Sequence, residues 1–176
     1  MTDDEKLKVW SGYAEISRKW ITVMDAKAGF ISGLNFGLLA LLWSGAKIQD
    51  GGCLTKWLGV IATLLIVVSV ICAIVSAIPR ESLSKIFGKG IRWSGNYKPF
   101  SYYGFVAQTF EPSDFERLKT EANTLDTARV AEEALEQHFV LSHTIARKSG
   151  YVRIAGSLLA GATCLSGLTV IARLLS

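Results

Sequence analysis

The stretch that decides the fold is residues 58–75, which read LGVIATLLIVVSVICAIV. It carries no charge and lies within a longer uncharged run, residues 57–79. An α-helix rises about 1.5 Å per residue, so roughly 20 apolar residues cross a hydrocarbon core of about 30 Å. Residues 57–79 therefore predict a transmembrane helix.

Two further runs without charge, 28–46 and 154–172, meet the same length requirement. Hydrophobic residues make up 50% of the 176 residues, which is more than a soluble domain of this size usually carries. We therefore expect an all-α membrane protein with three transmembrane helices, at 28–46, 57–79 and 154–173.

Lysine and arginine mark the side of the membrane on which each segment lies, because cytoplasmic flanks keep the excess of positive charge. They accumulate before the first predicted span, after the second and before the third, whereas the segment 47–56 carries only Lys47 and Lys56. We expect the N-terminus and residues 80–153 in the cytoplasm, and the 47–56 loop and the C-terminus outside. The first 27 residues include five acids and do not resemble a signal peptide, so we expect them to be retained.

Both cytoplasmic segments next to a span have a helical pattern. Residues 1–27 lack proline and repeat apolar residues near helical spacing, so they predict one helix that is continuous with the first span. Residues from Thr124 onward predict a second long helix that enters the third span. The first and third spans should thus extend into a cytoplasmic helical bundle. Between them, Ser113 and Glu116 have the spacing of a capping box for a short helix over 114–122.

Three glycines recur every fourth residue in the first span, at Gly29, Gly33 and Gly37. They lie on one helix face, where another backbone can approach closely. Packing within one chain explains such a seam as well as association of several chains does. Since three helices enclose no aqueous pore, we favour a homo-oligomer.

Asn35 lies near the middle of the first span, where an unpaired amide would cost a few kcal/mol. One interpretation is a hydrogen bond between helices, and the other is a ring of amides that lines a pore in an oligomer. Both place the side chain toward the interior of a bundle.

Asp25 lies at the cytoplasmic end of the first span, where acids are not favoured. Lys148 and Arg153 lie at a similar depth before the third span. We expect an interfacial ion pair between these groups that holds the two long helices in register.

Catalysis finds little support in the sequence, and we expect no enzyme and no cofactor. Arg129 and His138 are the only candidates for a helical ribonuclease, but eight residues separate them, more than the usual four to six. His138 and His143 do not share a helix face well enough to bind a metal ion, and we expect no metal. The three cysteines form no disulfide or metal pattern, and no basic and aromatic interleaving predicts nucleic-acid binding.

Three stretches resemble the transmembrane effectors of Pycsar antiphage defence, the PycTM family. Residues 25–40 read DAKAGFISGLNFGLLA and carry the Asp-Ala-Lys-Ala core that leads into a span with Leu-Asn. Residues 102–107, YYGFVA, with SDF at 113–115, and residues 141–148, LSHTIARK, are similar to two further segments of that family. The resemblance extends from about residue 10 to the end of the chain.

The resemblance implies a bacterial inner-membrane protein with a periplasmic C-terminus that acts in abortive infection. A cyclic pyrimidine mononucleotide, cUMP or cCMP, would trigger it to impair the membrane. The chain has no room for a separate β-roll nucleotide sensor, so a bound nucleotide would use the cytoplasmic helical region. We expect its phosphate at basic residues and its base at tyrosines, with Arg80, Lys89, Arg92, Arg147, Tyr102 and Tyr103 as the candidates. The alternatives are a constitutive or partner-regulated membrane pore or scaffold, and a membrane-tethered ribonuclease.

Overall fold

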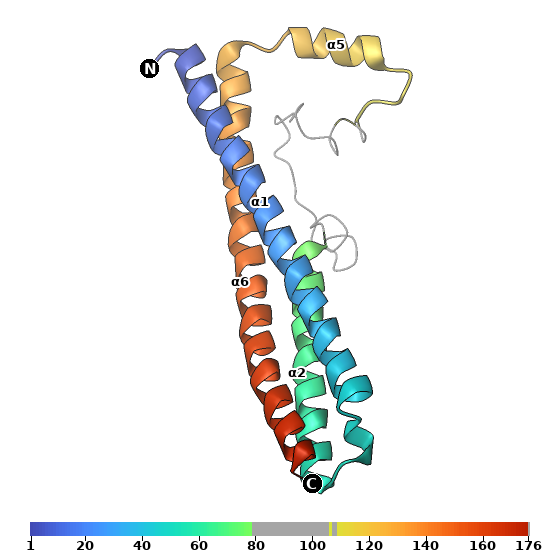
Figure 1. The fold of residues 1–176 in the computed structure, drawn as a ribbon. Helices are drawn as coiled ribbons and strands as arrows, with labels where there is room; N and C mark the ends of the chain where they lie inside the picture. The colour runs from blue at the N-terminus through green and yellow to red at the C-terminus, as the bar shows by residue number, and fades with distance from the viewer. Residues whose placement is uncertain (79–105, 107–108, 176) are drawn as a thin grey trace. The chain divides into compact units, whose positions relative to one another are not determined.

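The computed structural model describes residues 1–78, 106 and 109–175. This part of the chain is helical and contains no strand, as expected for an all-α protein. Its long helices are α1 (Asp3–Ala40), α2 (Cys53–Ala77) and α6 (Thr127–Leu174), and a short helix α5 (Phe115–Asn123) precedes α6 (Figure 1). Three helical segments are long and apolar enough to cross a membrane: Asp3–Gly45, Cys53–Ala77 and Thr127–Leu174.

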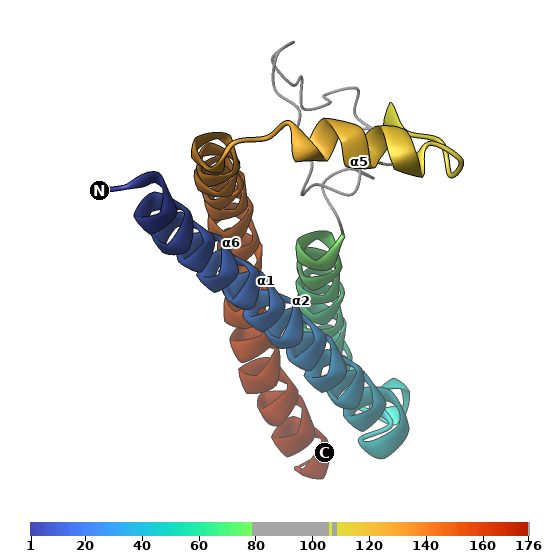
Figure 2. The same cartoon turned by 90° about the horizontal axis from the view of Figure 1, so that it is seen from above.

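The chain divides into two compact units. The first unit contains Met1–Lys19 and Arg80–His143, and the second contains Trp20–Pro79 and Thr144–Ser176. We call the second unit the bundle, because it is made of α2 and of the adjoining parts of α1 and α6 (Figure 2). α1 is continuous from Asp3 and α6 from Thr127, three residues after the expected start at Thr124, and the absence of proline allows this.

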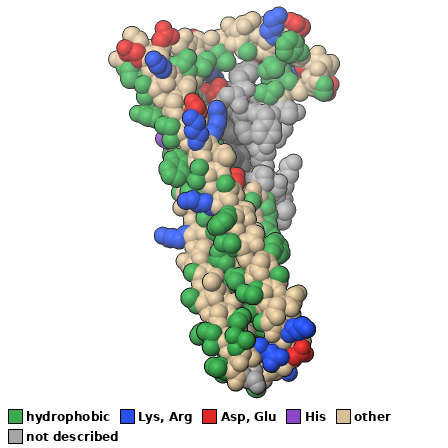
Figure 3. Space-filling model, in the orientation of Figure 1, with side chains coloured by type: hydrophobic (Ala, Val, Ile, Leu, Met, Phe, Trp, Pro, Cys, Tyr) green, Lys and Arg blue, Asp and Glu red, His purple; other side chains and the backbone are tan. Residues whose placement is uncertain are grey.

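The bundle buries many small and polar residues beside a few large apolar ones such as Leu42 and Ile66, and many of its large apolar residues are exposed. Its buried residues include Asn35, four hydroxyl-bearing residues and several alanines, as at Ser69, Ser76, Ser166, Thr169, Ala62, Ala73, Ala155 and Ala162. Phe30, Leu64 and Ile71 are among the large side chains that are exposed, and Figure 3 shows hydrophobic side chains on the molecular surface. Transmembrane helices pack in this way, because lipid takes the place of water around the apolar side chains.

Fewer residues lie outside helices between α1 and α2 than the expected loop over 47–56 contains. α1 continues into a π-helical turn, Leu41–Gly45, in which the Ala46 N–H donates to the Leu41 carbonyl at 2.7 Å. Lys47 then adopts a left-handed conformation (φ 47°), and α2 begins at Cys53, after Gly52. α2 therefore begins several residues before its apolar run, which starts at Trp57.

The capping box expected at Ser113 and Glu116 is wrong. α5 begins after Asp114, which makes no capping hydrogen bond to the helix. The Asp114 carboxylate instead accepts a hydrogen bond from the Glu111 N–H at 3.4 Å. A capping box is present at the start of α1, where Thr2 and Glu5 bond to each other's backbone N–H.

Gly59 on α2 provides a test of how tightly the turn packs. A Cβ at this position would lie 2.5 Å from Cδ1 of Ile48, a buried side chain of the turn. We expect Gly59→Ala to destabilise the bundle by about 1–3 kcal/mol, the usual cost of overpacking. Equilibrium unfolding in mixed micelles measures this change.

The matched control is Gly29→Ala, because a Cβ at Gly29 meets no atom within 4 Å. This variant should keep or slightly raise stability, since alanine favours helix over glycine by about 0.5–1 kcal/mol. Adding Ile48→Val, which removes Cδ1, should recover part of the loss in Gly59→Ala. Equal losses in Gly59→Ala and Gly29→Ala would contradict the packing described here.

Candidate functional site: a polar centre in the helix bundle

Asn35 connects the three helices of the bundle near the C-terminal end of α1. Its side chain is fully buried, and its Nδ2 donates to Ser69 Oγ of α2 at 2.8 Å and to the Ile31 carbonyl at 3.0 Å. Ser69 Oγ in turn donates to the Ala155 carbonyl of α6 at 2.8 Å. One chain of hydrogen bonds therefore links α1, α2 and α6.

Two buried side-chain oxygens in the bundle have no hydrogen-bond partner among the described residues. Asn35 Oδ1 is buried and has no hydrogen-bond partner among the described residues. The orientation of the amide is fixed by its neighbour, because the Ile31 carbonyl can only accept and so requires the nitrogen beside it. Ser166 Oγ on α6 is a second buried oxygen without a partner in the described part of the chain. Each such atom costs about 1–3 kcal/mol in a dry interior.

An ion pair joins α1 and α6 elsewhere in the bundle. The Lys148 ammonium of α6 pairs with the Asp25 carboxylate of α1. The Lys148 side chain is only 10% exposed, whereas that of Asp25 is 41% exposed. Arg153, the second expected partner, is exposed.

Gly29, Gly33 and Gly37 do not pack against the described part of the chain. A Cβ added at any of the three would meet no atom within 4 Å, and all three residues are exposed. They lie on a different face of α1 from Asn35, which is buried. The glycine face is therefore open in a single copy.

The residues expected to bind a nucleotide fall mostly outside the described residues. Arg80, Lys89, Arg92, Tyr102 and Tyr103 belong to the part of the chain that is not described. Arg147 is described, and it is exposed on α6.

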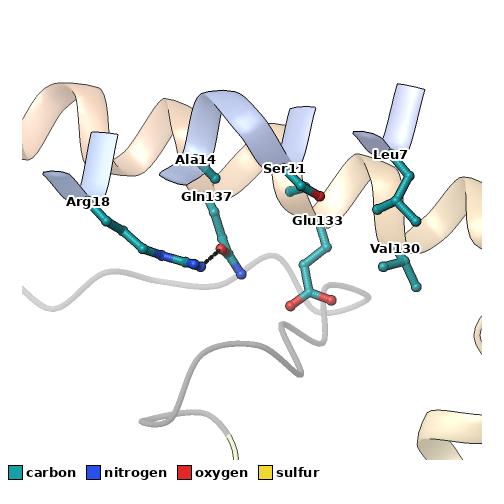
Figure 4. A pocket seen from close by; sticks show the side chains of 8 residues that line it. Leu7, Ser11, Ala14, Arg18, Val130, Glu133 and Gln137 are labelled. Atoms are coloured by element: carbon teal, nitrogen blue, oxygen red, sulfur yellow. Dashed lines mark hydrogen bonds between the residues drawn. The ribbon is translucent and has the colours of Figure 1, made fainter. Parts of the chain in front are cut away.

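The first unit contains a groove that the sequence did not indicate. It lies between α1 and α6, has a volume of about 180 Å³, and contains Arg18, Glu133, Gln137 and Ser11 among its lining residues (Figure 4). Arg18 Nη2 donates to Gln137 Oε1 at 2.6 Å, and Glu133 is buried. Since pockets for small ligands usually span about 300–1,000 Å³, further residues would have to complete a site here.

The model of the Pycsar effector protein domain, PycTM, matches residues 14–175. This match includes both the bundle and most of the first unit. The chain belongs to the PycTM family. The resemblance seen in the sequence is thus confirmed, and no curated protein and no solved structure matches the chain.

Membership in the PycTM family makes this protein a transmembrane effector of Pycsar antiphage defence. The PycTM domain is a helical transmembrane domain, which points away from an enzyme. The three membrane-spanning candidates of the fold agree with a membrane protein of this kind.

The two residues considered for a ribonuclease do not share a helix face in this PycTM protein. Arg129 and His138 are nine residues apart on α6, and at about 100° per residue they point in opposite directions. His138 instead shares a hydrogen bond between its Nδ1 and Ser17 Oγ at 2.9 Å, and its ring contacts Tyr13. Among the described residues, no group of three or more His, Cys, Asp or Glu side chains could hold a metal ion.

The ion pairs on the surface of α1 near its N-terminus join residues three or four positions apart. Asp3 accepts a hydrogen bond from Lys6 and raises the pKa of its ammonium group, and Lys19 lowers the pKa of the Glu15 carboxyl in the same way. Exposed pairs of this type contribute little to stability. They do not form part of the polar centre.

Proposed function

We propose that this PycTM effector responds to a cyclic pyrimidine mononucleotide, cUMP or cCMP, by rearranging as a homo-oligomer that breaches the bacterial inner membrane. The observation that carries the proposal is the polar centre of the bundle. Loss of the membrane barrier would end the infection together with the infected cell.

The polar centre supports a breach because its unpaired oxygens gain hydrogen bonds when water reaches them. Asn35 Oδ1 and Ser166 Oγ have no donor in the closed bundle. Separation of α1, α2 and α6 would expose these atoms and the hydroxyl groups of Ser69, Ser76 and Thr169 to water. Many large apolar side chains, such as Phe30, Leu64 and Ile71, already face outward and can stay in lipid, whereas Leu42 and Ile66 are buried between the helices and would have to move.

The geometry of the bundle supports a homo-oligomer. Three helices pack against one another without an aqueous channel, so a path for ions needs helices from several copies. The open glycine face of α1 at Gly29, Gly33 and Gly37 leaves room for another helix to approach.

The first unit supports nucleotide binding by its chemistry. A guanidinium group suits a phosphate, and a carboxylate and an amide suit ribose hydroxyls and the edge of a pyrimidine. Arg18, Glu133 and Gln137 supply these groups at one groove of the first unit. Because α1 and α6 each belong to both units, a ligand between them in the first unit would act on the helices of the bundle.

The proposed arrangement places the N-terminus and residues 80–153 in the cytoplasm and the C-terminus in the periplasm. The asymmetric distribution of lysine and arginine supports it. The nucleotide, produced in the cytoplasm, would then meet the first unit directly.

Membrane potential in cells that make the effector together with a pyrimidine cyclase tests the proposal. We expect depolarisation with an active cyclase and none with a catalytically dead cyclase. Arg18→Ala should weaken the response, and Lys19→Ala, the adjacent exposed base, should not.

Two outcomes would contradict the proposal in different ways. Depolarisation that is equal with active and dead cyclase would indicate a constitutive or partner-regulated pore. A membrane that stays polarised at every level of cUMP and cCMP, while the effector is present in the membrane, would exclude the nucleotide as trigger.

A further inference from the structure

One stripe of mostly apolar residues along α1 packs against other helices of the same chain. Its members alternate steps of three and four residues from Leu7 to Leu42, and they are buried or half-buried. This 3–4 alternation is the heptad pattern by which helices pack side by side. The stripe consists of Leu7, Trp10, Ala14, Ser17, Ile21, Met24, Ala28, Ile31, Asn35, Leu38 and Leu42.

A second stripe with the same alternation lies beside the first. Its members are Val9, Tyr13, Ile16, Trp20 and Val23, which we call the α1 seam. Three of its positions, Tyr13, Ile16 and Val23, directly precede buried members of the first stripe, and one residue turns the helix by about 100°. The seam therefore lies to one side of the first stripe, and its side chains are 39–53% exposed, although Tyr13 also contacts His138 of α6.

Lipid cannot cover most of the α1 seam. Val9 precedes the predicted first span at residue 28 by about 28 Å, at about 1.5 Å per residue along a helix. The seam thus lies in water over most of its length, where a contiguous row of large apolar side chains marks an interaction surface.

We propose that the α1 seam is the contact between two copies of this chain, packed as a parallel pair of α1 helices. This proposal rests on the proposed function, because it names the surface through which the homo-oligomer would form.

The extent of the stripe points to a second copy rather than to a soluble protein. The heptad continues along α1 to Phe30 and Leu34, which are 68% and 44% exposed. A partner that follows this stripe must be a helix that runs through water and then into lipid. α1 of a second copy is such a helix, and with the same topology in the membrane it places the same residues at the same height.

The charges beside the seam allow identical helices to meet. Glu15 and Lys19 flank it and pair with each other at 2.8 Å, so that flank carries both signs. Lys27 occupies the heptad position between Val23 and Phe30, at the predicted membrane boundary, where its long side chain can reach the headgroups. Gly33 and Gly37 follow on the same side of the helix without a contact within the described chain.

Cysteine cross-linking in membranes tests this contact. In a background with Cys53→Ser, Cys72→Ala and Cys164→Ala, single cysteines replace seam residues in Val9→Cys, Ile16→Cys and Val23→Cys. The matched controls are Lys8→Cys, Glu15→Cys and Thr22→Cys, each one residue earlier and exposed. Because a disulfide needs Cβ atoms about 3.5–4.5 Å apart, we expect dimers at the three seam positions and none at the controls.

The experiment needs neither phage nor nucleotide, so it does not depend on the trigger. Co-expression of two differently tagged copies shows whether a cross-linked product contains both. Absence of dimers at all six positions, or equal dimer formation at seam and control positions, would refute the contact. A product with only one tagged copy would assign the seam to a different protein. Dimers at the seam in a protein that never depolarises the membrane would keep the contact and reject the proposed function.

Discussion

Asp25→Ala is expected to destabilise the bundle far more than Lys148→Ala does. The Lys148 side chain is 10% exposed, so removal of Asp25 leaves an ammonium group in the interior without its partner. Breaking a buried pair in this way costs about 3–5 kcal/mol, and we expect about 3 kcal/mol because water still reaches the Asp25 side. Equilibrium unfolding in mixed micelles measures the loss.

Lys148→Ala leaves the Asp25 carboxylate without its partner, but this side chain is 41% exposed and can be hydrated. Lys148→Ala should therefore cost less than Asp25→Ala, and the double variant Asp25→Ala/Lys148→Met should recover most of the loss, since it buries no charge. Lys27→Ala removes an exposed base two residues from Asp25 and serves as the control, with a change within about 0.5 kcal/mol. Equal losses in Asp25→Ala and Lys148→Ala would show that the ammonium group is not held in the interior.

Length and hydropathy were sufficient to predict the three long helices, because crossing lipid requires unbroken apolar runs. The absence of proline was sufficient to predict that α1 and α6 continue beyond those runs. The turn between α1 and α2 was not predictable in detail. Its π-helical bond at Leu41–Ala46 and the left-handed Lys47 depend on how Ile48 packs against α2.

The partners in the polar centre could not be derived from the sequence. In a membrane helix both faces are apolar, so hydropathy does not show which hydroxyl of α2 faces Asn35. Ser69 is selected by the relative register of α1 and α2. For Asp25 the sequence indicated two partners, Lys148 and Arg153, and only the packing of α1 on α6 selects Lys148.

The groove at Arg18 and Gln137 was missed for a related reason. It is formed by two helices whose register is set over many turns. A signal was present in the heptad alternation from Leu7 to Leu42, which identifies the face of α1 that packs. That face contains Ala14 and Ser17, and its edge contains Arg18.

Asn35→Leu is expected to abolish depolarisation while leaving the bundle as stable as before or more so. Leucine has a similar volume, and the substitution removes the unpaired Oδ1. Ser69 Oγ keeps its own acceptor, the Ala155 carbonyl, so no donor is left without a partner. Replacing a poorly satisfied buried amide by an apolar group is therefore neutral or stabilising by about 1 kcal/mol, whereas the open state loses a group that water would hydrate.

Stability and activity must be measured on the same variants, because an interhelical hydrogen bond alone makes the opposite prediction. If Asn35 only holds the helices together, Asn35→Leu lowers the free energy of unfolding, and depolarisation falls only as far as the amount of folded protein. Ser166→Ala removes the second unpaired oxygen and should also keep or raise stability. Ile71→Ala, near Ser69 on α2 but exposed, should leave depolarisation unchanged. A stable Asn35→Leu protein that still depolarises the membrane would remove the polar centre from the mechanism, because its hydration would then contribute nothing to opening.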